Sequence, residues 1–96
     1  MTKEIIARVE QIISERQQNV PEGSYTAYLF REGQDKILKK LGEEATETVI
    51  AAKNGDRQQI AYEASDLIYH LLVLLRYHDM TWADIVAEME QRHIAE

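Results

Sequence analysis

Two pairs of acidic residues with the same spacing are the feature of this sequence that could do chemistry. Glu44 and Glu47 are three positions apart, and Glu63 and Asp66 are three positions apart. On a helix this spacing turns two side chains only about 60° from each other, so each pair points in one direction. Carboxylates that gather in one place repel unless a cation lies between them. Magnesium takes carboxylate and phosphate oxygens, so the pattern predicts a Mg²⁺ site for a phosphate-bearing substrate.

The segment between the two pairs predicts a helical hairpin. Asn54-Gly55-Asp56 combines a glycine that suits the left-handed end of one helix with an aspartate that can cap the next. Hydrophobic residues recur at helical spacing on both sides of it. We therefore predict helices over 34–53 and 57–78 that run antiparallel.

This hairpin would bring the four acids level with one another. Glu47 and Glu63 each lie seven residues from the turn, and Glu44 and Asp66 each lie ten residues from it. With helix axes about 8–10 Å apart, the four carboxylates can converge on one small volume. The alternative is a solvated acidic helix face, since the chain has 17 acidic residues. We favour the metal site because Glu63 and Asp66 lie among apolar residues, where a carboxylate needs a compensating cation.

Several other residues could complete such a site. Lys36 and Lys40 lie one turn apart and could bind phosphates, although Lys40 could instead form an ordinary ion pair with Glu44. His70 is expected to be a hydrogen-bonded helix histidine, with proton transfer as its alternative role. The candidate substrate-binding residues are Lys36, Lys40, Tyr25, Lys53 and Asn54.

Composition limits the classes of function. With 96 residues, 45% of them hydrophobic, residues 1–96 are expected to form one domain. The net charge of −6 disfavours binding to nucleic acid or to an anionic membrane. The absence of cysteine excludes disulfides and thiolate zinc sites. The first residues lack the apolar run of a signal peptide, so we expect a cytoplasmic protein.

The helical periodicity predicts an all-α, four-helix bundle-like domain built around the central hairpin. A first helix is expected over 3–18, a short helical turn after Ser24, and a last helix opened by a capping box at 81–84. The wide apolar face of the helix over 57–78 predicts a partner subunit. The predicted core stripe of the helix over 34–53 consists of Ile37, Leu38, Leu41, Ala45, Val49 and Ala52.

The acidic motifs resemble those of a known family. Gly42–Glu47 reads GEEATE and Glu63–His70 reads EASDLIYH, within a wider match that includes Ser24-Tyr25-Thr26 and Gly33. This pattern resembles phosphoribosyl-ATP pyrophosphohydrolase, a member of the all-α nucleoside triphosphate pyrophosphohydrolase superfamily, over essentially the whole chain. The superfamily's metal ligands would then be Glu44, Glu47, Glu63 and Asp66.

The resemblance implies a reaction and an assembly. The reaction would be Mg²⁺-dependent hydrolysis of phosphoribosyl-ATP to phosphoribosyl-AMP and pyrophosphate, the second step of histidine biosynthesis. The catalytic residues would be Glu43, Glu44 and Glu47, with Glu43 or Glu44 as the general base. We expect a monofunctional form and a homodimer or higher homo-oligomer. The alternatives are a housecleaning nucleoside triphosphate pyrophosphohydrolase and a non-catalytic acidic helical interaction protein.

Overall fold

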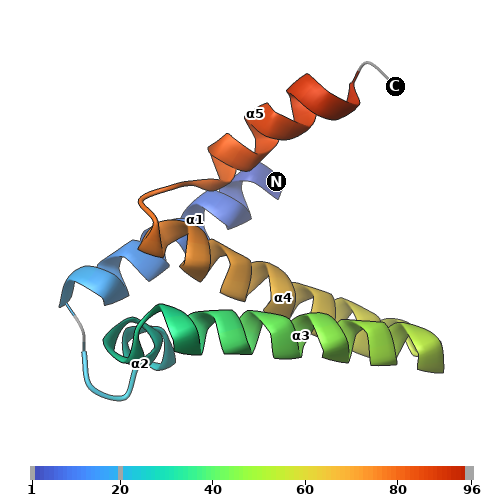
Figure 1. The fold of residues 1–96 in the computed structure, drawn as a ribbon, viewed down its shortest axis with the longest axis horizontal. Helices are drawn as coiled ribbons and strands as arrows, with labels where there is room; N and C mark the ends of the chain where they lie inside the picture. The colour runs from blue at the N-terminus through green and yellow to red at the C-terminus, as the bar shows by residue number, and fades with distance from the viewer. Residues whose placement is uncertain (1, 20, 95–96) are drawn as a thin grey trace.

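The computed structural model describes residues 2–19 and 21–94, which fold into helices and short turns (Figure 1). The all-α prediction is confirmed. Of the predicted domain 1–96, Met1, Val20, Ala95 and Glu96 lie outside the described residues. No helix in the described ranges has the length and apolar character needed to cross a membrane. The helices are α1 (Thr2–Asn19), α2 (Tyr25–Glu32), α3 (Gln34–Asn54), α4 (Arg57–Tyr77) and α5 (Trp82–His93).

The predicted hairpin is present, and α3 and α4 form the most extensive helix pair in the described part of the chain. Gly55 ends α3 in the left-handed conformation, with φ of 72°, and its N–H bonds to the carbonyls of Ala51 and Ala52. The side chain of Asp56 caps α4 by accepting from two backbone N–H groups. The turn lies at the end of the molecule opposite α2 (Figure 1).

The helix α2 is longer than the helical turn predicted from the sequence. Ser24 caps it by accepting from the N–H of Ala27 at 3.1 Å, and Gly33 ends it with φ of 96°. Thr26, in the first turn of α2, is buried and hydrogen-bonded to the hydroxyl of Tyr69 on α4. The Thr26–Tyr69 hydrogen bond joins α2 to α4, and α2 also packs against α3 and α1.

The hydrophobic core lies where α1, α2, α3 and α4 meet. Its buried residues are Ile13, Leu29, Ile37, Leu72, Val73 and Leu75.

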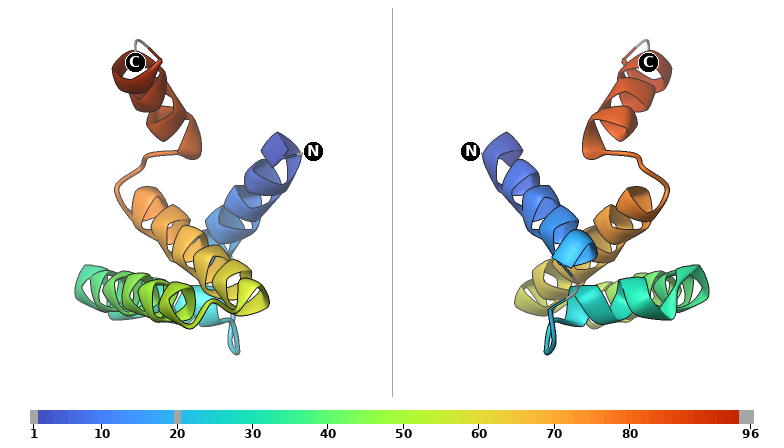
Figure 2. Two further views of the ribbon diagram at one scale, coloured as in Figure 1. Left: turned by 90° about the vertical axis from the view of Figure 1, so that its right-hand side faces the viewer. Right: turned by 90° about the vertical axis from the view of Figure 1, so that its left-hand side faces the viewer.

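By contrast, α5 projects away from this body in both views of Figure 2. Its first turn is tied to the rest through packing of Trp82 and Ile85 on the core and a 2.8 Å hydrogen bond from the Trp82 N–H to Glu10. The predicted capping box at Thr81 and Asp84 is present.

The predicted core stripe of α3 is wrong in part. Leu38 and Val49 are 44% and 63% exposed and Ala52 is also exposed, while the residues buried on α3 are Ile37, Glu44 and Ala51. Each of these three positions is seven residues from the next, which is the spacing of a narrow contact between two closely packed helices. The seam against α4 therefore passes through an acidic residue, and apolar residues beside it face outward.

Replacing Asp56 with alanine should destabilise the hairpin, because two N–H groups at the start of α4 would lose their acceptor. We expect a loss of about 1 kcal/mol in the free energy of unfolding, measured by urea denaturation. The control is Glu88→Ala, at an exposed position within α5. Equal stability of the two variants would contradict this account of the turn.

Candidate functional site

Three carboxylates meet in the seam between α3 and α4. Glu44 on α3 and Glu63 on α4 are buried, with 5% and 7% of their surfaces exposed, and Asp66 lies one turn further along α4. One ligand oxygen from each of the three lies within 4.8 Å of the other two. Three acids so close and so little hydrated would repel strongly in the ionised state. Their arrangement requires protons or a cation.

Two oxygen atoms in this group have no partner in the described part of the structure. Glu44 Oε2 and Glu63 Oε2 are both buried and accept no hydrogen bond. A buried carboxylate oxygen without a donor is costly, and a hard cation removes that cost by coordination. A set of ligands made only of carboxylate oxygens suits Mg²⁺, Ca²⁺ or Mn²⁺. The residues present therefore fit a divalent metal.

Glu47, the fourth predicted ligand, is exposed one turn along α3 and is not among the three residues whose oxygens gather within 4.8 Å, but it influences two of them. A hydrogen bond with Glu47, together with burial and the charges of Glu47, Glu44 and Asp66, raises the pKa of Glu63 to about 7. Burial and a hydrogen bond with Glu47 also raise the pKa of Glu44. Without a metal the group thus takes up protons, because a proton shared between two carboxylates relieves their repulsion.

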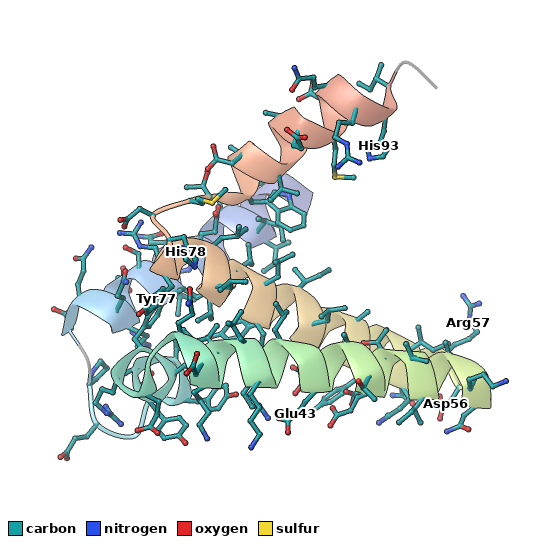
Figure 3. The ribbon with its side chains drawn as sticks, in the orientation of Figure 1. Glu43, Asp56, Arg57, Tyr77, His78 and His93 are labelled. Carbon is teal, nitrogen blue, oxygen red and sulfur yellow. The ribbon has the colours of Figure 1, made fainter. Side chains whose placement is uncertain are left out.

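Lys40 supplies positive charge at the edge of the carboxylate group. Its Nζ lies 3.6 Å from Glu43 Oε1 and 3.7 Å from Glu44 Oε1. Burial lowers the pKa of Lys40, but the neighbouring Tyr25, Glu43 and Glu44 outweigh this, and the net shift is upward. The ion pair predicted as the alternative role of Lys40 is present, and the ammonium group also lies beside the carboxylates. Glu43 points outward from α3 (Figure 3).

Tyr25 and His70 form a link to the group that the sequence did not predict. The hydroxyl of Tyr25 lies 2.8 Å from His70 Nε2, and His70 Nδ1 lies 2.7 Å from the backbone carbonyl of Asp66. His70 is only 4% exposed, so the expected hydrogen-bonded helix histidine is confirmed. The spacing of Asp66 and His70 predicts their contact, but nothing in the local sequence links them to Tyr25.

The remaining predicted residues are spread along α3. Lys36 lies with Nζ 5.8 Å from the ring centre of Tyr28, which tilts against Tyr25 at 6.3 Å. Asn54 lines a cavity of about 210 Å³ together with Glu47 and Glu63. Lys53 is exposed on the last turn of α3 and is not among the residues lining that cavity. Gln59 and Ile50 also line it, and neither was predicted.

Comparison with known proteins gives a consistent family. The model of the phosphoribosyl-ATP pyrophosphohydrolase family matches residues 6–93. A phosphoribosyl-ATP pyrophosphatase of Pelotomaculum thermopropionicum is 53% identical, over 94% of this chain and 92% of that protein. That of Geobacter sulfurreducens is 51% identical, over 93% and 82%. The histidine biosynthesis bifunctional protein HisIE of Bacillus subtilis is 55% identical over 93% of this chain, which spans only 43% of that relative's length.

The raised pKa of Glu63 predicts a pH dependence of stability in the metal-free protein. The folded state binds the proton of the Glu63 carboxyl more tightly than the unfolded chain does, because this carboxyl has a pKa of only 4.5 when the chain is unfolded. The resulting stabilisation is complete below the unfolded pKa and is lost as the pH rises through about 7. In EDTA, wild type should therefore lose stability relative to Glu63→Gln between about pH 5 and pH 8. Urea unfolding at the two pH values measures this, and Glu88→Gln should follow wild type. Parallel behaviour of wild type and Glu63→Gln would refute it.

Proposed function

Because the chain belongs to the phosphoribosyl-ATP pyrophosphohydrolase family, we propose that it hydrolyses phosphoribosyl-ATP to phosphoribosyl-AMP and pyrophosphate, the second step of histidine biosynthesis. The observation that carries the proposal is the group formed by Glu44, Glu63 and Asp66, buried between two helices in the matched region. Relatives that carry the name of this activity cover nearly the whole chain. The chain spans about 43% of its bifunctional relative, so the activity is proposed for this domain.

We propose that the cofactor is Mg²⁺, held by Glu44, Glu47, Glu63 and Asp66. The two buried oxygens without partners support this proposal, as does Glu47, which lines one cavity together with Glu63. When bound, the ion would neutralise phosphate oxygens and offset the charge that develops on the leaving pyrophosphate. The rest of the work falls to the protein's own side chains.

Those side chains bind the phosphates and accept a proton. Lys40, which is partly exposed beside Glu43 and Glu44, would bind the oxygens of the triphosphate, with Lys36 one turn away. In the reaction, water bonds to phosphorus, the bridging bond between the α and β phosphates breaks, and a carboxylate takes the water's proton. Glu44 belongs to the proposed metal-binding group. We therefore propose Glu43, which lies outside that group next to Lys40, as the general base that takes the proton from water.

We also propose that the working unit is a homodimer or higher homo-oligomer in the cytoplasm, and that residues 1–96 act as a single domain. A groove of about 370 Å³ runs between α1 and α4, and it supports the proposal of a partner subunit. It is lined mainly by apolar side chains, including the exposed Ile5 and Ile68. Exposed apolar area of this kind is typical of subunit contacts.

The substrate is tested by pyrophosphate release from matched nucleotides. We expect Mg²⁺-dependent turnover of phosphoribosyl-ATP, with ATP, dCTP and dUTP hydrolysed at least about 100-fold more slowly in kcat/KM. A site that binds the second phosphoribosyl group loses this binding energy with the simpler nucleotides. A preference for dCTP or dUTP would instead identify a housecleaning hydrolase. Absence of turnover with any of them would favour a non-catalytic protein.

Two isosteric variants separate the roles of Glu43 and Glu44. Glu43→Gln should keep the Mg²⁺-dependent rise in melting temperature but lose about 100-fold or more in kcat, as expected for removal of a general base. Glu44→Gln should lose the Mg²⁺-dependent stabilisation itself, because a metal ligand is missing. Calorimetric melting with and without MgCl₂, together with kcat, measures both. The reverse pattern would make Glu44 the base and Glu43 a ligand.

A further inference from the structure

The hydrogen bonds of His70 determine where its proton lies. A backbone carbonyl can only accept, so the bond to Asp66 requires the hydrogen on Nδ1 of the imidazole. In a neutral imidazole the other nitrogen then accepts, so Nε2 takes the hydroxyl proton of Tyr25. Both hydrogen bonds therefore have a fixed direction. The Tyr25 hydroxyl donates to His70 Nε2, and His70 Nδ1 donates to the backbone carbonyl of Asp66.

Packing holds this link in one orientation. His70 is 4% exposed, and its ring stands edge-on to Tyr25 with centres 5.7 Å apart, at an interplanar angle of 77°. Tyr69 stands edge-on to the same imidazole at 5.8 Å. Tyr25 itself is 45% exposed, so its ring is anchored at the buried side while the other side remains open.

The hydroxyl of Tyr25 is joined to the backbone of the carboxylate group through His70, which lies 2.8 Å from this hydroxyl and 2.7 Å from the carbonyl of Asp66. Burial raises the pKa of Tyr25, Lys40 lowers it, and Glu44 and Asp66 raise it again. The net shift is upward, so Tyr25 keeps its proton. With that proton committed to His70, the oxygen offers only lone pairs to a molecule bound at the site.

Lone pairs select what Tyr25 can bind. Phosphate oxygens are acceptors and would be repelled by another acceptor, so Tyr25 does not suit the triphosphate. The hydrogen-bond donors on a nucleotide closest to its phosphates are the hydroxyls of the ribose that carries them. We propose that Tyr25 accepts a hydrogen bond from a hydroxyl of this ribose, and that His70 is the positioning residue that holds Tyr25 in the accepting state.

The proposal rests on the proposed function and is tested with modified substrates. The probes are phosphoribosyl-ATP and its 2′-deoxy and 3′-deoxy analogues, altered on the ribose that carries the triphosphate. Tyr25→Phe should lower kcat/KM for the parent substrate about three- to tenfold, mainly through KM, as for the loss of one neutral hydrogen bond. With the analogue that lacks the recognised hydroxyl, wild type and Tyr25→Phe should be equal. An equal loss with all three substrates overturns the proposal, whereas an inactive wild type would refute the proposed function instead.

A second variant tests His70. His70→Phe keeps an aromatic ring but removes the acceptor, so the Tyr25 proton can turn toward the site. We expect it to reduce the discrimination against the deoxy analogue and to show no further loss when combined with Tyr25→Phe. His78→Phe, at an exposed position after α4, is the matched control and should discriminate as wild type does. Additive losses in the double variant would contradict the link.

A spectroscopic readout keeps the proposal testable even if the buried variant does not fold. Nitrogen-15 NMR of the wild-type imidazole distinguishes the two neutral tautomers. At about pH 8, where free imidazole is neutral, His70 should show a protonated Nδ1 and an unprotonated Nε2. The opposite tautomer would mean that Tyr25 accepts from His70 and has a proton to offer, which overturns the proposal.

Discussion

Repulsion among the carboxylates is the constraint around which this structure is organised. Glu44, Glu63 and Asp66 present oxygens within 4.8 Å of one another in a seam where two of the three are buried. Water cannot screen charges there, so the ionised group is stable only with bound protons or a bound cation. The raised pKa values of Glu44 and Glu63 correspond to the state with bound protons. A nucleotide hydrolase would use the second, because the same cation that relieves the repulsion also binds phosphate.

Such a group needs a rigid support, and the hairpin provides it. The Gly55 turn and the Asp56 cap fix the register of α3 against α4, which keeps acids from the two helices level. The short helix α2 closes the other end of the same seam, since it carries Tyr25 to His70 and Thr26 to Tyr69. The proposed site therefore has three carboxylates at its middle, the ammonium group of Lys40 at its edge, and the Tyr25 hydroxyl hydrogen-bonded to the buried His70.

The sequence predicts those parts of this arrangement that depend on local spacing. The helix boundaries, the turn at 54–56 and the level acids follow from residues close in the chain. The buried face of α3 is predicted less well, because helical periodicity places Leu38 and Val49 in the core stripe and omits Ala51, which is buried. Leu38 and Val49 are exposed since α4 covers only a narrow seam. The bond between Tyr25 and His70 joins residues 45 positions apart, and no local pattern could reveal it.

The central claim is that Glu44, Glu63 and Asp66 share one divalent cation. A crystal grown with Mn²⁺ in place of Mg²⁺, with diffraction recorded at the manganese absorption edge, tests it directly. The account predicts an anomalous peak between α3 and α4, about 2.0–2.3 Å from an oxygen of each residue. Saturating Mn²⁺ with no peak there, and the three carboxylates turned into separate surroundings, would contradict it.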